Sequence, residues 1–235
     1  MKGSSYYNDR DRLSPHFKEA DEVHVLFDHP DIWDINLKSN VQKKRDAGKK
    51  PIPPLQGPIS DDTAVPTPKM WSSFLANRQD KRKLVVYIGE KLKLAQEWLQ
   101  PGQTLIVGGC FTNKQTYMIT QGSIQAVSNL YSNHEEADTR IFLHMAWSQK
   151  LTCVIVASDS DLFFILLLNH GEFKNKQVVI QSSDQRSRLD MKKLMTMMED
   201  DPNTDLSRIR KDGVSTAFFY GFAHLLAGTD ILCTP

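Results

Sequence analysis

A seven-residue apolar run followed closely by two aspartates constrains the fold of this chain more than any other feature. The run, Leu151 to Ala157, is continuous and rich in β-branched residues. Such a run predicts a strand that is covered on both faces, as in a parallel sheet. Asp159 and Asp161 stand just beyond its carboxyl end. Because ligands bind outside these strand ends in open α/β sheets, the run predicts both a fold class and the place of a site.

The remaining periodic segments predict an α/β fold with a mainly parallel central sheet flanked by helices, because helices alternate with short strands. We expect residues 22–235 to form a single domain that follows a polar leader, residues 1–21. The expected strands are Glu22–Phe27, Thr104–Val107, Gln115–Thr120, Leu151–Ala157 and Val178–Gln181. The expected helices are Asp80–Leu99, a helix from about Asn133 to Gln149, Leu189–Glu199 and Ser215–Ala227.

Residues 38–69 combine a basic run with a proline-rich stretch. Six prolines between Pro51 and Pro68 exclude regular structure there and predict a long loop. The net charge of +1 gives no general attraction to nucleic acid, so only a local patch can provide it. The basic run either holds a phosphate backbone, or is a solvated loop or a nuclear import signal. Its cationic residues are Lys38, Lys43, Lys44, Arg45, Lys49 and Lys50.

Cysteine usage and hydropathy indicate an intracellular protein of the nucleus or cytoplasm. Cys110, Cys153 and Cys233 lie far apart and form no CxxC pair, which predicts neither a disulfide framework nor a zinc site. The longest apolar run, Leu162 to Leu168, is too short to cross a bilayer, and the polar residues 1–21 do not resemble a signal peptide. We therefore expect no membrane partner.

Short acidic segments recur where strands are expected to end or helices to begin. Like charges that lie close together raise one another's pKa and oppose folding, and a bound cation removes the conflict. The segments therefore predict a shared metal site. Its candidate ligands are Asp28, Glu135, Glu136, Asp138, Asp159, Asp161 and Asp230.

Several of these acids also have ordinary structural interpretations. The Asp159-Ser160-Asp161 spacing occurs in solvated turns. Glu135 can complete a capping box with Ser132, and Glu136 can form a helix-surface ion pair with Arg140. Asp138 is harder to explain in this way, because a helical wheel places it on the face of Ile141 and Met145, where a carboxylate is costly unless it is paired or metal-bound.

The ligand types select the metal. Carboxylate oxygens without a nearby cysteine or paired histidine favour Mg²⁺ or Mn²⁺ over zinc. Two such ions about 4 Å apart activate a water and stabilise the leaving oxygen of an in-line displacement at phosphorus. The pattern predicts a two-metal nuclease that needs no protein nucleophile.

The order of these motifs resembles the PIN-like nuclease superfamily, in its flap-endonuclease-related branch. The motifs are Val-Leu-Phe-Asp28 before the basic run, Glu136-Ala137-Asp138, Ser158-Asp159-Ser160-Asp161 and Gly228-Thr229-Asp230. The octapeptide from Asn133 to Arg140 and the Gly221-Phe-Ala-His224 segment resemble more closely a group of uncharacterised animal proteins with a PIN-like domain.

This resemblance implies metal-dependent cleavage of DNA or RNA. It carries over as metal ligands Asp28, Glu136, Asp138, Asp159, Asp161 and Asp230, and Glu135 remains a candidate beside Glu136. Members of the superfamily begin with a further strand that ends in an acid, and they continue beyond the last motif. We therefore expect a domain that is incomplete at the N-terminal strand and at the C-terminus. The alternative function is a catalytically inactive PIN-like module that binds nucleic acid or a protein partner.

Overall fold

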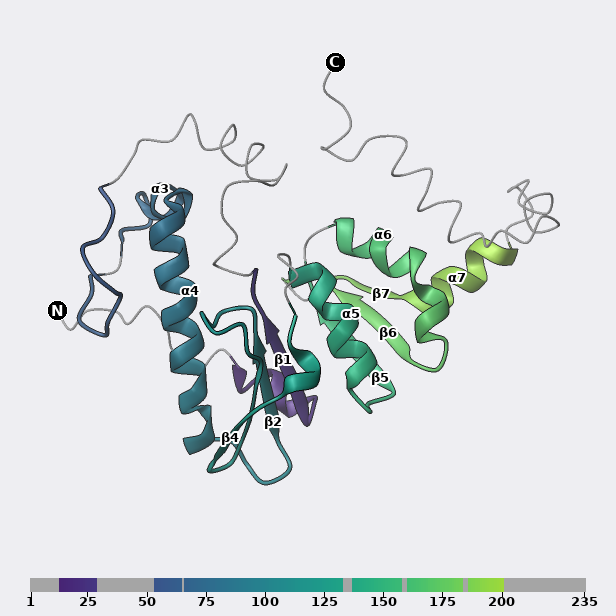
Figure 1. Cartoon of the computed structure of the whole chain (residues 1–235). Helices are drawn as coiled ribbons and strands as arrows, with labels where there is room; N and C mark the ends of the chain where they lie inside the picture. The colour runs from purple at the N-terminus through teal and green to yellow at the C-terminus, as the bar shows by residue number, and fades with distance from the viewer. Residues whose placement is uncertain are drawn as a thin grey trace, which may run out of the picture. The chain divides into compact units, whose positions relative to one another are not determined.

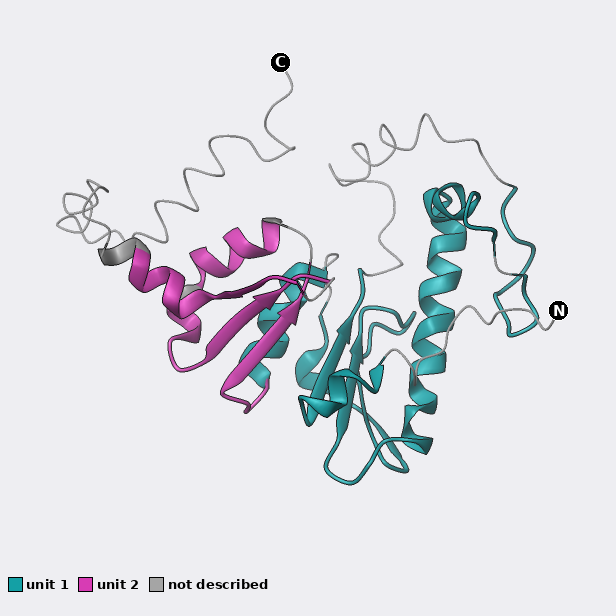
Figure 2. Cartoon of the chain, turned by 180° about the vertical axis from the view of Figure 1, so that it is seen from behind, with its two compact units in different colours: residues 1–147 teal, residues 148–235 magenta. Residues whose placement is uncertain are grey.

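The structure, a computed structural model, describes residues 13–28, 53–64, 66–132, 137–157, 160–183 and 186–200. The chain divides into two compact units, residues 1–147 and residues 148–235 (Figure 2). Each unit is described by itself below. The expectation that residues 22–235 form a single domain stays a prediction.

A four-stranded mixed sheet forms the centre of unit 1, in the order β1-β2-β3-β4. Its strands are β1 (Glu22–Leu26), β2 (Thr104–Gly108), β3 (Tyr117–Thr120) and β4 (Ser123–Ala126). β1 and β2 are parallel, with Glu22 opposite Thr104, whereas β2–β3 and β3–β4 are antiparallel. The antiparallel pairs follow from short connections, since residues 109–116 and 121–122 are too few for the crossover that a parallel pair requires.

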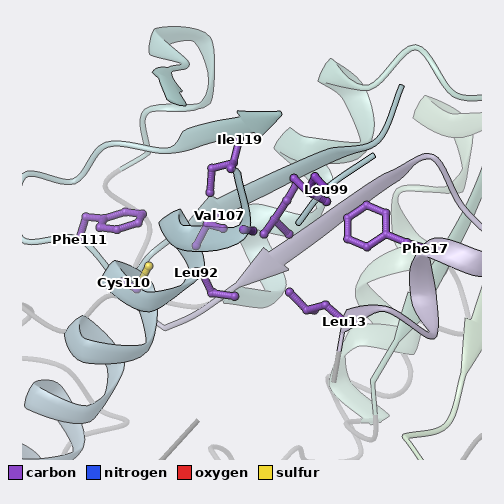
Figure 3. Packing of buried hydrophobic residues seen from close by; sticks show 10 residues of the cluster. Leu13, Phe17, Leu92, Leu99, Val107, Cys110, Phe111 and Ile119 are labelled. Atoms are coloured by element: carbon purple, nitrogen blue, oxygen red, sulfur yellow. The ribbon is translucent and has the colours of Figure 1, made fainter. Parts of the chain in front are cut away.

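One face of this sheet is covered by α4 (Arg78–Leu92) and the 3₁₀ turn η2 (Lys93–Glu97). Asn77 caps α4, because its side-chain oxygen accepts the backbone N–H groups of Gln79 and Asp80. The core cluster joins helix side chains such as Leu92 to strand side chains such as Val107 (Figure 3). The predicted helix 80–99 is thus confirmed as α-helix to Leu92 and continues as a 3₁₀ turn.

The opposite face of the sheet meets α5 (Ala137–Trp147), so unit 1 has three layers. Figure 1 shows α4 and α5 on either side of the β1–β2 pair. Alternation along β1 explains the two faces, because Val23 and Val25 pack into the α4 core while His24 contacts α5. The short 3₁₀ turn η3 (Ser128–Leu130) precedes α5 and buries Leu130.

Two segments expected to be loose contribute to the core instead. Residues 13–19 were expected within a polar leader, but the 3₁₀ turn η1 (His16–Lys18) places Leu13 and Phe17 in the main cluster. Leu13 and Phe17 are four positions apart, so one helical turn directs both side chains to the same side.

The described part of the proline-rich stretch has no helix or strand before α3 (Trp71–Ala76), as predicted, but it is anchored on α4. The backbone N–H of Leu55 donates to both carboxylate oxygens of buried Asp80, at 3.0 and 3.2 Å. Lys83 Nζ donates to the carbonyl of Leu55 at 2.6 Å. Ile59 is buried with Phe74 of α3, so this stretch forms a second small core with α3 and α4.

Unit 2 contains a three-stranded sheet in the order β5-β6-β7. Its strands are β5 (Thr152–Val156), β6 (Gln177–Gln181) and β7 (Arg188–Asp190), and its helices are α6 (Ser160–Leu168) and α7 (Met191–Asp200). β5 and β6 are parallel and are joined through α6 and the 3₁₀ turn η4 (His170–Phe173), whereas β7 is antiparallel to β6.

The α/β class is confirmed, but a single mainly parallel sheet is not. Of the five ladders among the described residues, two are parallel and three antiparallel. β5 was expected to be covered on both faces, yet Val154 and Val156 are 52% and 45% exposed. Its apolar run reflects β-propensity as much as burial, since only Ile155 is fully buried. No helix among the described residues is long and apolar enough to span a bilayer.

Candidate functional site

Asp28 lies where the sequence predicted it, directly beyond β1 and exposed to solvent. The backbone N–H of Phe27 donates to the carbonyl of Gly108, which continues the parallel pairing past the last β1 residue. Gly109, which directly follows β2, has φ +85°, and a Cβ there would overlap the carbonyl oxygen of Phe27. A glycine is therefore required beside the backbone that carries Asp28.

The Asp28 carboxylate contacts the described start of α5. Its Oδ1 accepts the backbone N–H of Ala137 at 3.1 Å. A carboxylate at this position is favourable, because the first N–H groups of a helix have no partner within the helix and carry partial positive charge. Asp28 therefore has a structural role in addition to any chemical one.

Arg140 supplies a second positive charge near Asp28. Its side chain is only 1% exposed. Burial lowers its pKa, and the charges of Cys110 and Asp28 oppose that decrease. The sequence predicted Arg140 only as a surface ion-pair partner of Glu136. A buried guanidinium in the first turn of α5 was not predicted.

Asp138 lies in the first described turn of α5 and is half-buried. The fully buried positions of this helix are Arg140, His144 and Met145. The face that meets the sheet is thus centred on a polar pair four residues apart, while Ile141 is half-buried like Asp138. The helical wheel predicted correctly that Met145 faces the sheet. It did not predict that Arg140 and His144 are buried on this helix.

Asp161 lies in the first turn of α6, beyond the carboxyl end of β5, and is exposed. It belongs to unit 2, whereas Asp28 and Asp138 belong to unit 1. Each unit therefore places a candidate acid after the first strand of its parallel pair. Within the described residues, no group of three or more histidine, cysteine or acidic side chains is arranged to hold a metal ion.

The other predicted site residues lie outside the described residues, so their roles stay predictions. They are the acids Glu135, Glu136, Asp159 and Asp230, and the basic residues Lys38, Lys43, Lys44, Arg45, Lys49 and Lys50. The predicted helix Ser215–Ala227 also lies outside that part of the chain.

A contact between half-buried His24 of β1 and buried His144 of α5 was not predicted. His24 Nδ1 and His144 Nδ1 are 2.8 Å apart, and His24 Nε2 is 2.9 Å from Glu22 Oε1. The rings of His24 and Trp147 meet edge to face, with centroids 6.2 Å apart. The only signals in the sequence were a polar residue inside an apolar strand and a histidine four residues after Arg140.

These contacts decide which nitrogen atoms carry protons. Glu22 requires a donor at His24 Nε2, so a neutral His24 accepts at Nδ1 and His144 donates from its own Nδ1. Burial lowers the pKa of His24 even though Glu22 opposes the decrease. Burial lowers the pKa of His144 to about 3, and repulsion from the protonated form of His24 and from Arg140 contributes to the decrease. Both rings are therefore neutral at physiological pH.

No family model and no solved structure matches the chain. Among characterised proteins, the chain is similar to the RNA helicase aquarius of Mus musculus, with 33% identity over 95 residues. The matched stretch is 40% of this chain and 6% of that helicase, so the chain spans only a small part of its relative's length.

Proposed function

We propose that the chain is a Mg²⁺- or Mn²⁺-dependent nuclease of the PIN-like, flap-endonuclease-related type, which hydrolyses phosphodiester bonds of DNA or RNA. One observation carries the proposal. In each unit, a candidate acid lies beyond the carboxyl end of the first strand of a parallel pair, Asp28 after β1 and Asp161 after β5. This is the place where ligands bind in α/β proteins.

The donor set fits hard divalent cations. Asp28 and Asp161 are exposed carboxylates, and Asp138 is half-buried at the start of α5, next to the Ala137 that donates to Asp28. Ala137 donates to Oδ1 of Asp28, and in this proposal Oδ2 ligates the cation. Glu135, Glu136, Asp159 and Asp230 are the further ligands in this proposal. Bound Mg²⁺ or Mn²⁺ would supply an activated water and stabilise the leaving oxygen.

The partner class in this proposal is nucleic acid. The likeness to a protein named an RNA helicase supports RNA as the first substrate to test, with DNA second. The basic run supplies the phosphate contacts. Replacing Lys43, Lys44 and Arg45 together with alanine should weaken binding to all sequences equally and flatten the salt dependence. Loss of nuclear import with unchanged binding would show that the run is an import signal.

A second candidate is a catalytically inactive module that binds nucleic acid or a protein. It is favoured by the contacts of Asp28, whose carboxylate accepts the Ala137 N–H and lies within the field of buried Arg140. Both contacts explain a carboxylate at this position without any metal. The two candidates differ in what they require of Asp28. The nuclease requires a carboxylate that ligates a cation, whereas the inactive module requires a side chain that accepts from Ala137, with the field of Arg140 adding to its stability.

Asp28→Asn and Asp28→Ala together separate the candidates. Asparagine retains an acceptor for Ala137 but removes the charge, whereas alanine removes both. For the nuclease, Asp28→Asn abolishes Mn²⁺-dependent cleavage of labelled single-stranded, flapped and duplex RNA and DNA, with chelator as the blank. Asp62→Asn, an exposed acid in another part of unit 1, is the matched control and should cleave normally.

Absence of chelator-sensitive cleavage by the wild-type chain on every substrate would favour the inactive module. In that case Asp28→Ala should lower the melting temperature more than Asp28→Asn, because asparagine keeps an acceptor for Ala137. A metal readout independent of activity is thermal unfolding. If the acids share a site, Asp159→Asn should raise the melting temperature in chelator, because it relieves repulsion, and should abolish the gain from Mg²⁺. A variant that still gains as much as wild type would count against a shared metal site.

A further inference from the structure

A hollow of about 860 Å³ lies in unit 2, at the opposite end of the strands from Asp161. Its wall includes the first residues of the parallel strands, Thr152 of β5 and Gln177 of β6, and the first turns of α7. The hollow is thus built at the amino ends of the strands, in the unit coloured magenta in Figure 2. We call it the lysine groove, after its four lysines: Lys174, Lys176, Lys192 and Lys193.

Within the described part of the chain, the four lysines of the groove form no ion pair, and the one acid that interacts with them electrostatically is Asp190, through Lys193. Lys176 Nζ donates to two carbonyl oxygens, those of Ser148 and Lys150, each at 2.7 Å. Among the described residues, no carboxylate lies within 4.0 Å of any of the four ammonium groups. Neutral carbonyls therefore position one lysine while the net charge of the wall stays positive.

Asp190 is the one acid in the wall, and it has a structural task. Its Oδ1 accepts the backbone N–H groups of Lys192 and Lys193, at 3.0 and 3.1 Å, and its Oδ2 accepts Nε2 of Gln177 at 3.2 Å. These bonds lower the pKa of Asp190, so it remains charged. By capping α7 it fixes the first turn of that helix, from which Lys192 and Lys193 extend into the groove.

Two large apolar side chains also line the groove. Leu151 and Met197 are each 70% exposed. A bound duplex offers phosphates but keeps its bases stacked inside, and the aspartate and glutamate side chains of an acidic peptide have no flat apolar faces. A single nucleic-acid strand offers both regularly spaced phosphates and the faces of unpaired bases.

We propose that the lysine groove binds a single strand of nucleic acid, with lysine ammonium groups on its phosphates and Leu151 and Met197 against its bases. The inference shares the nucleic-acid partner of the proposed function, but it requires neither metal nor catalysis. Within unit 2 the groove lies at the amino ends of β5 and β6, whereas Asp161 lies beyond the carboxyl end of β5, so the groove and this candidate ligand can be removed separately.

The test is fluorescence anisotropy of the whole chain with a short labelled single strand, in chelator, between about 50 and about 200 mM salt. Lys192→Glu with Lys193→Glu should weaken binding at least about ten-fold and reduce the slope of log K against log salt by about 1.4, or 0.7 per phosphate contact. The cap on α7 uses backbone N–H groups, so these variants keep it, and acidic residues suit a helix start. Lys192→Gln with Lys193→Gln removes the charge without adding repulsion and should lose affinity in the same direction.

The matched control is Lys81→Glu with Lys114→Glu, which makes the same change in net charge at two exposed positions of unit 1. It should bind as wild type does. Met197→Ser should weaken binding of a normal strand but not of an abasic strand, because only the first has bases to contact.

Normal binding by both lysine variants would overturn the proposal, as would equal losses in the matched control. Tighter binding of polyglutamate or of anionic vesicles than of the single strand, sensitive to the same substitutions, would assign the groove to a different partner and also overturn it. Asp28→Asn should leave groove binding in chelator intact. If Asp28→Asn loses cleavage but the lysine variants bind normally, the proposed function is supported and the proposed groove is excluded.

Discussion

The pair formed by His24 and buried His144 makes the stability of unit 1 depend on pH, by an amount that can be calculated. His144 is 3% exposed, and its pKa is lowered to about 3 in the folded chain. In the unfolded chain the same ring has an ordinary pKa of about 6.5. His144 is therefore protonated below about pH 6.5 in the unfolded state, but only below about pH 3 in the folded state. Stability conferred by the neutral ring is present above pH 6.5 and is lost as the pH falls through this window.

The magnitude follows from proton linkage. As the pH falls from about 7.5 to about 5, protonation of His144 in the unfolded state alone lowers the free energy of unfolding by about 2 kcal/mol. His24, whose pKa is also lowered, acts in the same direction. His144→Asn keeps an amide donor that can serve His24 but cannot titrate. We expect this variant to be less stable at neutral pH, through lost packing, and to lose about 2 kcal/mol less than wild type on acidification.

The assay is urea unfolding followed by circular dichroism at both pH values. His16→Asn is the matched control, because His16 lies in η1, away from the pair. This variant should lose as much unfolding free energy on acidification as wild type does. The titration of the His144 ring can be followed directly by NMR. A midpoint near 6.5 for that ring, or an equal acid-induced loss in wild type and His144→Asn, would refute the reasoning.

Two further predictions concern backbone contacts. Asp80→Ala leaves the N–H of Leu55 without its buried acceptor and should lower the free energy of unfolding, measured in urea, by about 1–3 kcal/mol. Asp80→Asn keeps an acceptor and should lower it less. Equal losses in the two variants would contradict this account. Gly109→Ala combines a positive φ with overlap of Phe27 and should cost more than about 2 kcal/mol. Gly122→Ala, at φ +69° with nothing near the added Cβ, measures the cost of the positive φ alone and should cost only about 1 kcal/mol. Similar losses for Gly109→Ala and Gly122→Ala would show that overlap with Phe27 adds nothing.

Local periodicity predicted most of the described elements. β1, β2, β5 and β6 lie within a residue or two of their predicted bounds, and α4 begins two residues before its predicted start. β4 was missed because it is a short segment with two exposed residues, formed by pairing with β3 across a two-residue turn. β7 was assigned to the helix that follows it, since Leu189 fits the helical spacing of α7 but pairs with Ile180.

The candidate site could be predicted only as far as single strands and helices allow. The positions of Asp28 and Asp161 beyond strand ends follow from sequence, because a strand's end is a local property. The contact of His24 with His144 does not, since it joins residues 120 positions apart and depends on how α5 packs on β1. The convergence of the predicted metal ligands is a tertiary property of the same kind, and it stays a prediction.

The close approach of Gly109 to Phe27 provides a criterion for recognising distant relatives of this chain. The backbone carrying Asp28 passes through space that only a glycine at the end of the neighbouring strand leaves open. A relative that keeps the aspartate but carries a larger residue at the glycine position must displace the end of its first strand, and the carboxylate with it. Sequence searches that score the aspartate and the glycine as a linked pair would therefore distinguish chains able to place this carboxylate from chains that merely contain one.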